Sequence, residues 1–216
     1  YDRAKKELDE LLTRNPTDAQ ALLLKAVMFR LGGSPAKAVA VATQAIEQHP
    51  EFAAALSVRA RAYVVMGELE MAKNDLEAAR NLSKTPQASM ELAGIYTRLG
   101  RDDDSINVLK SVVAEYKTYE AALYKLIEMY VKAKDWANAE KQFADAHQAF
   151  PKQPNYWMVE GEMWRLRQQT AKSISAYEQA FALDKESAPV VRAYLLGLLE
   201  GKAYDKALTT ANSYKT

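Results

Sequence analysis

The sequence predicts an all-α protein built as an α-solenoid. Its 216 residues include only 8 glycines and 7 prolines. No stretch rich in valine, isoleucine and threonine alternates apolar with polar residues as a β-strand does. A helical pattern of small and large apolar residues recurs about every 34 residues. These observations predict one unpaired N-terminal helix followed by about six helix pairs stacked in a row.

One helix of each period is marked by a small residue. This residue recurs at steps of 34, 34, 33, 34, 34 and 34, at Ala4, Ala38, Ala72, Ser105, Ala139, Ser173 and Ala207. Further apolar residues follow four and seven positions later, on the same face of the helix. In the segment AKAVAVATQAIEQHP, residues 36–50, this face consists of alanines. We expect the alanines to make room for a closely packed neighbouring helix.

The other helix of each period supplies larger side chains. A small or apolar residue is followed three positions later by Phe29, Tyr63, Tyr96, Tyr130, Trp164 and Leu198. We expect these residues, together with Trp157, to pack in the core between helices. Helices of this length, roughly 14 residues, are marginal alone in water and gain their stability from such packing.

Turn residues separate the predicted helices. Gly33, Gly67 and Gly100 fall inside successive periods, where a left-handed residue ends a helix. Asp135 is predicted to cap the helix that begins at Trp136, and Thr17 with Gln20 predicts a capping box.

A 34-residue pair of helices with this arrangement resembles the tetratricopeptide repeat (TPR). The period closest to the W-x2-L-G-x2-Y, A-x3-F, P signature carries Leu126, Ile127, Tyr130, Ala139, Phe143, Ala146 and Pro151. The resemblance implies a right-handed superhelix. Lys25, Arg59 and Glu160 stand where the signature has leucine. We expect their stems to pack while their charges reach water.

We expect residues 1–216 to form a single array of repeats, and we expect this array to be an excerpt of a longer protein. The predicted segments are an orphan helix at 1–15 and repeats at about 17–50, 51–84, 85–117, 118–151, 152–185 and 186–216. The interrupted ends predict possible end-to-end self-association.

Composition and motifs argue against several function classes. With 29 basic and 28 acidic residues the formal net charge is +1, which does not favour nucleic-acid binding. The chain has no cysteine, and no apolar run is long enough to span a membrane. Metal-ligand spacing is absent at both histidines, His49 and His147, and at the acidic run of residues 102–104. We therefore expect no enzyme activity, no cofactor and no metal.

The resemblance implies that the first helix of each pair lines a concave groove where ligands bind. The candidate contacts are Arg30, Arg61, Met90, Thr97, Arg98, Tyr124, Glu128, Lys132, Met158, Glu162 and Arg165. Arg30, Arg61, Arg98, Lys132 and Arg165, here called the basic series, supply one cation per repeat. Arginine suits carboxylates because its planar fork can donate two parallel hydrogen bonds.

The expected function is a non-catalytic scaffold that binds a protein or peptide, an acidic extended segment in particular. The alternative is a periplasmic assembly scaffold of a bacterial exopolysaccharide secretion system, which contacts the polymer or its synthase and export proteins. This alternative follows from a general similarity to alanine-rich periplasmic TPR segments, and it favours the periplasm over the cytoplasm. Tyr124 is the only good groove aromatic, and sugar binding would use several, so protein binding is preferred.

Overall fold

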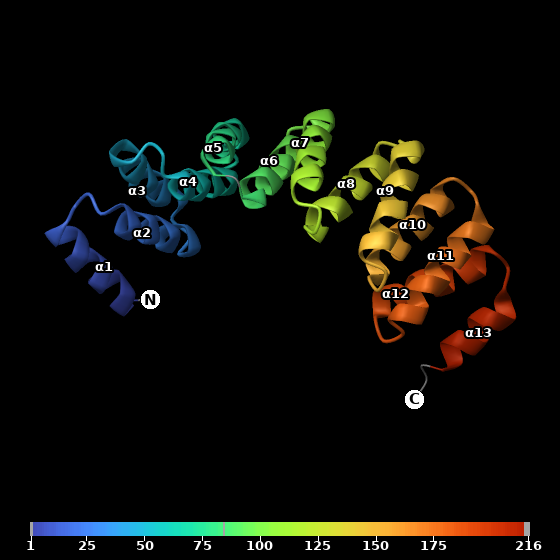
Figure 1. Ribbon diagram of the computed structural model, residues 1–216. Coiled ribbons are helices and arrows are strands. Elements are labelled where there is room, and N and C mark those ends of the chain that lie inside the picture. Colours follow the sequence, from blue (N-terminus) through green and yellow to red (C-terminus); the bar gives the residue numbers. More distant parts are fainter. Residues whose placement is uncertain (1, 84, 214–216) are drawn as a thin grey trace. The chain divides into compact units, whose positions relative to one another are not determined.

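The protein is described by a computed structural model that covers residues 2–83 and 85–213. These residues form thirteen α-helices and no β-strand (Figure 1). The helices are α1 (Asp2–Arg14), α2 (Ala19–Leu31), α3 (Pro35–Gln48), α4 (Ala53–Met66), α5 (Leu69–Leu82), α6 (Pro86–Arg98), α7 (Asp102–Glu115), α8 (Glu120–Lys132), α9 (Trp136–Ala149), α10 (Pro154–Leu166), α11 (Thr170–Leu183), α12 (Ala188–Glu200) and α13 (Tyr204–Asn212). The all-α prediction, with six helix pairs behind a single helix, is confirmed.

The chain forms two compact units, residues 1–116 and 117–216. Unit 1 contains α1 and the pairs α2/α3, α4/α5 and α6/α7. Unit 2 contains the pairs α8/α9, α10/α11 and α12/α13. Within each unit every helix packs against the next one in sequence, and first helices of successive pairs also touch, such as α2 with α4 and α10 with α12.

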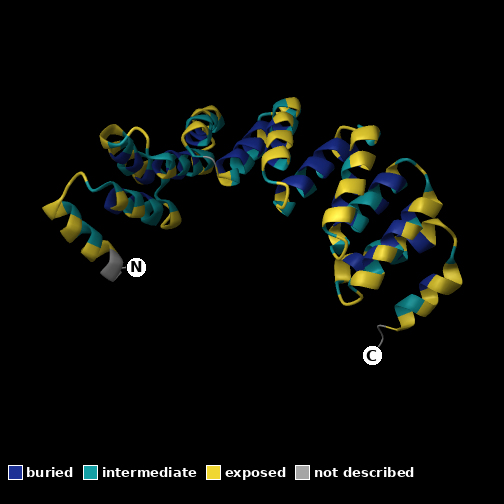
Figure 2. Ribbon diagram, in the orientation of Figure 1, coloured by how far each residue is buried: buried dark blue, intermediate teal, exposed yellow. Residues whose placement is uncertain are grey.

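The core of each unit is a series of small clusters, each built by three consecutive helices. Leu22, Ala45 and Ala55 join α2, α3 and α4, while Leu56 and Ala79 pack with Ala88 to join α4, α5 and α6. Figure 2 shows buried residues recurring along successive helices of both units, while the turns are mostly exposed. Each helix pair is therefore completed by its neighbour, as expected for a solenoid.

The small-residue pattern is confirmed by burial. Apart from Ala4, whose side chain lies outside the described set, every small residue that marks a period is at most 5% exposed, namely Ala38, Ala72, Ser105, Ala139, Ser173 and Ala207. Of the large side chains, Tyr96, Tyr130, Trp164 and Leu198 are buried, whereas Phe29, Tyr63 and Trp157 are only half-buried.

A left-handed residue recurs at the turn inside every pair. Gly33, Gly67 and Gly100 have φ values of 72°, 84° and 73°, as the sequence predicts. In unit 2 the same place is taken by Lys134, Gln168 and Lys202, with φ values of 56°, 58° and 58°. A side chain is disfavoured in this conformation, so these three turns carry strain that the glycine turns avoid.

The predicted helix caps are partly right. The carboxylate of Asp135 accepts a hydrogen bond from the Asn138 backbone N–H, so this cap is confirmed. The capping box at Thr17 is wrong, because the first residue before α2 is Asp18, whose carboxylate accepts from the Ala21 N–H at 2.8 Å.

The three charged residues at the signature leucine position are paired. The Arg59 and Glu160 charges are largely withdrawn from water, which corrects the expectation for them, whereas the Lys25 pair stays partly exposed. The Arg59 guanidinium donates two hydrogen bonds to Asp75, at 2.8 and 2.7 Å, and a third to Thr43. Lys25 Nζ lies 2.7 Å from the Asp9 carboxylate. Glu160 lies 2.6 Å from the His147 ring. Each pair joins two consecutive helices, so a polar contact replaces the apolar one.

Glycine at position 161 is required by a close approach of two helices. A Cβ atom placed on Gly161 would lie 2.5 Å from the Tyr177 ring, whereas a Cβ on Gly94 would meet nothing within 4 Å. We predict that Gly161→Ala lowers the free energy of unfolding by about 1–3 kcal/mol. Gly94→Ala should raise it by about 0.5–1 kcal/mol, because alanine favours the helix.

All three tryptophans, Trp136, Trp157 and Trp164, belong to unit 2, so their fluorescence during urea unfolding reports on Gly161→Ala. Far-ultraviolet circular dichroism reports on Gly94→Ala. Equal effects of the two substitutions would contradict the packing described here.

Asp75 is only 6% exposed and depends on Arg59 for its charge balance. We predict that Arg59→Leu alone costs about 3–5 kcal/mol of stability, because it leaves a buried carboxylate unpaired. The double variant Arg59→Leu/Asp75→Leu should recover most of this loss, since well-packed apolar residues can replace a buried ion pair. Circular dichroism during urea unfolding measures both. A double variant as unstable as the single one would show that apolar packing cannot substitute here.

Candidate functional site: the first-helix faces of the two units

The first helix of each pair presents one stripe of side chains that the packing between helices leaves accessible. We call these stripes on α2, α4 and α6, and on α8, α10 and α12, the first-helix faces of unit 1 and unit 2. All eleven predicted contact residues lie on these six helices.

In unit 1 the central feature is an arginine fork. Arg61 of α4 donates from Nε and Nη2 to the two oxygens of Glu91 on α6, at 2.8 and 2.5 Å. Gln87, one turn before Glu91, donates to the same carboxylate at 2.8 Å. Burial raises the pKa of Glu91, but the hydrogen bonds from Arg61 and Gln87 and the charges of Arg61 and Arg30 bring it below its ordinary value. The carboxylate is therefore ionised and held by two helices.

The other two arginines of unit 1 are less engaged. Arg30 of α2 is half-buried, and its Nε atom is buried without a hydrogen-bond partner among the described residues. Arg98, at the end of α6, is exposed and has no ion pair within the described part of the chain. Arg61 and Arg30 both act on the Glu91 carboxylate, and Arg98 adds a third guanidinium further along α6, so cations outnumber this carboxylate on the face.

A small pocket of about 270 Å³ lies beside the arginine fork. Its polar lining comes from α4, from the turn before α6, and from α6 itself, and it consists of Ser57, Arg61, Ser83, Thr85 and Gln87. Hydroxyl and amide groups of this kind can hydrogen-bond the backbone of a bound segment.

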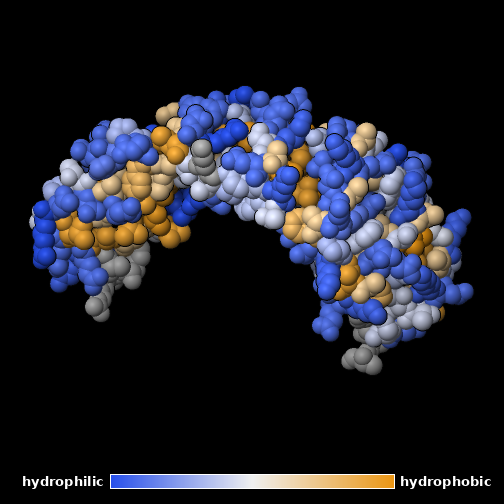
Figure 3. Space-filling view, in the orientation of Figure 1, coloured by the Kyte–Doolittle hydropathy of each residue, from blue (hydrophilic) through white to orange (hydrophobic). Residues whose placement is uncertain are grey.

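The same unit exposes large apolar side chains. Leu31 is 70% exposed and Val65 is 62% exposed, and Leu24 and Met66 are also exposed. Figure 3 shows hydrophobic residues gathered over α2 and α4. Apolar residues next to arginines are typical of interaction surfaces.

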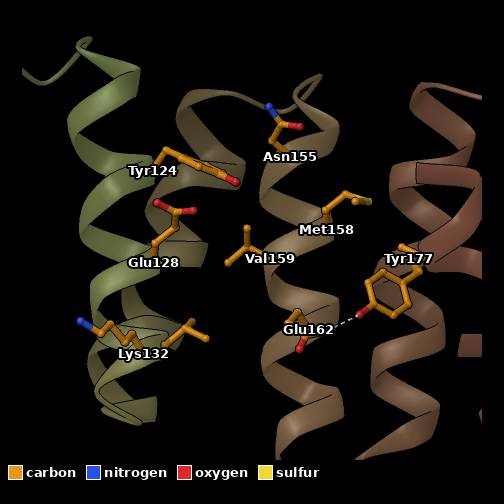
Figure 4. A pocket seen from close by; sticks show the side chains of 10 residues that line it. Tyr124, Glu128, Lys132, Asn155, Met158, Val159, Glu162 and Tyr177 are labelled. Carbon is orange, nitrogen blue, oxygen red and sulfur yellow. Dashed lines mark hydrogen bonds between the residues drawn. The ribbon is translucent and has the colours of Figure 1, made fainter. Parts of the chain in front are cut away.

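In unit 2 the first-helix face contains a pocket of about 470 Å³ (Figure 4). Its lining is Tyr124, Glu128, Val131, Lys132, Asn155, Met158, Val159, Glu162, Tyr177 and Ala193. Five of the predicted contacts are brought together here, and Glu128 and Glu162, 34 residues apart in sequence, both line the pocket. This volume is within the range of pockets that hold small ligands or single side chains.

Glu162 is fixed by two partners. Arg165 donates to both of its oxygens, at 2.8 and 2.6 Å, and the Tyr177 hydroxyl donates at 3.1 Å. The hydrogen bond from Arg165 lowers the pKa of Glu162 against the effect of burial. Burial and the neighbouring Glu162 charge raise the pKa of Tyr177 to about 12. Arg165 also lies 3.5 Å from Glu200 of α12, so its charge is balanced within the unit.

Glu128 is held less firmly. Its ion-pair partner among the described residues is Lys125, at 3.1 Å on the same helix, and both side chains are roughly two-fifths exposed, at 37% for Glu128 and 44% for Lys125. Tyr124, one turn earlier, packs edge-on against Tyr156 with ring centroids 5.9 Å apart. Burial raises the pKa of Tyr124, and the charge of Glu128 raises it further.

The remaining predicted contacts differ in accessibility. Met158 lines the pocket of unit 2, whereas Met90 is half-buried on α6. The Thr97 hydroxyl donates to the Ala93 carbonyl at 3.0 Å, so it is already used within its helix. Lys132 is exposed at the end of α8.

Sequence reasoning did not place Asn155, Val159, Tyr177 and Ala193 at this pocket. Tyr177 lies on a second helix and reaches the first-helix face because Gly161 and Gly197 have no side chains to block its ring. The glycines at these two helical positions were the available signal.

Within the described residues no group of three or more histidine, aspartate or glutamate side chains is arranged to bind an ion. His147 stacks on Trp157, with ring centroids 3.6 Å apart, and pairs with Glu160. No helix in the part of the chain that is described has the length and apolarity needed to cross a bilayer.

A protein with consecutive antiparallel helix pairs and accessible first-helix faces belongs to the helical repeat class. The sequence matches the family described as tetratricopeptide repeat over residues 10–213, so the chain belongs to the TPR family. A search of curated proteins gives no match.

Solved TPR structures share the fold at low sequence identity. A tetratricopeptide repeat protein from Parabacteroides merdae has a TM-score of 0.73 and 16% identity, over 90% of this chain and 78% of that one. YrrB, described as a TPR protein with an unusual peptide-binding site, has a TM-score of 0.68 and 16% identity, over 86% and 96%. The PilF protein of Pseudomonas aeruginosa has a TM-score of 0.68 and 15% identity, over 92% and 89%.

The low pKa of Glu91 predicts a pH dependence of stability. Since the pKa is below its value in the unfolded chain, about 4.3, the ionised form stabilises the fold above that pH. This contribution is lost as the pH falls through the folded-state value. We predict that stability decreases less between pH 5 and pH 3 in Glu91→Gln than in the wild type, as measured by urea unfolding.

Glu68→Gln, at an exposed residue, is the control and should leave the pH profile unchanged. Parallel profiles for wild type and Glu91→Gln would contradict the role of the fork.

Proposed function

We propose that this protein is a non-catalytic scaffold that binds extended segments of partner protein on the first-helix face of each unit. The observation that carries the proposal is the row of Arg30, Arg61 and Arg98 on three successive first helices, with Glu91 as the nearby carboxylate. Surplus guanidinium charge on consecutive repeats suits a segment with several carboxylates, because each repeat can contact a different residue of an extended chain.

The apolar surface of unit 1 refines this proposal. Leu31 and Val65 lie on the same helices as Arg30 and Arg61 and are largely exposed. A partner segment that combines acidic with apolar side chains would pair with the arginines and also remove this surface from water. The membership of the TPR family agrees with a protein partner.

A polysaccharide ligand has less support. Sugar rings stack on exposed aromatic faces, and the pocket of unit 2 offers Tyr124 as its half-exposed ring, while Tyr177 is buried. We therefore propose a protein or peptide as the ligand.

A peptide-display selection with the full chain as bait tests the proposal. We expect the selected peptides to be enriched in aspartate and glutamate, and to bind at least tenfold more weakly to Arg30→Glu/Arg98→Glu, measured by fluorescence anisotropy. Neither arginine donates a hydrogen bond within the Arg61–Glu91 fork, and the circular dichroism spectrum of the variant checks that its fold is retained.

The control is Lys5→Glu/Lys110→Glu, which reverses two exposed cations of unit 1 on α1 and α7 and should leave the affinity unchanged. Binding should also weaken as salt is raised, since exposed charges are screened. Peptides that bind both double variants equally, without dependence on salt, would refute the acidic-ligand proposal.

A further inference from the structure

The pocket of unit 2 differs in charge from the first-helix face of unit 1. Two carboxylates, Glu128 and Glu162, line it together with one ammonium, Lys132. Arg165, the other member of the basic series on these helices, is turned to Glu162 and Glu200 and does not line the pocket. The Arg165 guanidinium is therefore not available to a ligand in this pocket, unlike those of Arg30 and Arg98 on the face of unit 1.

We propose that this pocket binds a basic side chain of the partner segment, and arginine in particular. The inference rests on the proposed function, since it assigns a ligand class to the first-helix face of unit 2. It does not depend on the acidic residues proposed for unit 1, because every residue that lines this pocket belongs to unit 2.

The apolar wall of the pocket fits the stem of such a side chain. Tyr124, Met158 and Val159 come from two successive first helices and border the same space (Figure 4). Long basic side chains pack their methylene groups on apolar surface while the charged head reaches polar atoms. A guanidinium group can also stack on the face of Tyr124, whose orientation is fixed by its edge contact with Tyr156.

Glu128 is the group that would receive the charge. Its contact with Lys125 is an exposed pair within one helix, and pairs of this kind contribute little to stability. Exchanging this ammonium for a guanidinium that is partly removed from water, and that can donate two parallel hydrogen bonds, is favourable. Glu128 can therefore turn to the ligand at small cost to the fold.

Glu162 plays a different part. Arg165 and Tyr177 already hold both of its oxygens, so it stays in place when a ligand enters. Its carboxylate is a fixed polar part of the pocket lining, with its charge matched by Arg165. Tyr124 and Tyr177 lie on two sides of the pocket, and burial raises the pKa of both hydroxyls. The charge of Glu128 raises the pKa of Tyr124 further, and the charge of Glu162 does the same for Tyr177.

The test uses the full chain and two small probes, Nα-acetyl-arginine methylamide and its neutral isostere Nα-acetyl-citrulline methylamide. Titrations are followed by backbone amide chemical shifts of the ¹⁵N-labelled protein. We expect the arginine probe to shift amides of α8 and α10 around Glu128 and Val159 saturably. The citrulline probe, which has the same shape without the charge, should bind at least tenfold more weakly.

Two variants complete the test. Glu128→Gln should reduce the affinity for the arginine probe to that of citrulline. Asp145→Asn removes the same charge from an exposed position on the second helix α9 and should change nothing. The amide spectrum of each variant checks its fold. We expect Glu128→Gln to keep the fold, because the ion pair that it removes, with Lys125, is partly exposed and lies within one helix.

Equal binding of the two probes, unchanged affinity in Glu128→Gln, or shifts confined to other helices would overturn the inference. These outcomes are distinct from failure of the proposed function. Display-selected peptides that bind the first-helix faces but contain no basic residue would uphold the scaffold and refute the arginine pocket. An arginine probe that binds as described, with no peptide selected, would uphold the arginine pocket and refute the scaffold.

Discussion

Close approach between neighbouring helices is the constraint on which the rest of this structure depends. The clusters of the described residues are shared between pairs: in unit 1 the third helix comes from the next pair, and in unit 2 Tyr177 of α11 packs with residues of α12 and α13. In unit 1 the close approach is clearest where one helix face consists of alanines, as at Ala38, Ala42 and Ala45 of α3. The first-helix faces are accessible as a consequence, since packing uses the other sides of these helices.

Much of the fold could be predicted from sequence because it is governed by local periodicity. Spacing of three and four residues determined the buried faces, and Gly33, Gly67 and Gly100 located turns by a conformation that glycine favours. The equivalent turns at Lys134, Gln168 and Lys202 were not predictable in this way, because their side chains are tolerated there at some energetic cost and leave no compositional mark. The turn is recovered only by counting the period.

The polar contacts were harder to predict than the apolar ones. Arg59 and Asp75 are 16 residues apart on consecutive helices, and no single-helix pattern connects them. The same holds for Arg61 with Glu91, which lie on α4 and α6. Sequence reasoning therefore identified the basic series correctly as residues of the first helices, but could not see that Arg61 and Arg165 are matched by carboxylates. In unit 1 the pairing of Arg61 with Glu91 leaves the charges of Arg30 and Arg98 in surplus. In unit 2 the charge of Arg165 is balanced by Glu162 and Glu200.

The ion pairs at the signature leucine position also determine which helices can be neighbours. A leucine at this place packs acceptably against almost any apolar partner, so repeats that all carry it are interchangeable. Here Lys25 requires the carboxylate of Asp9, Arg59 requires Asp75, and Glu160 requires the imidazole of His147. A slip by one repeat would bring unmatched charges together between neighbouring helices. The departures from the family signature thus give the array an internal order, in which each repeat recognises the one beside it.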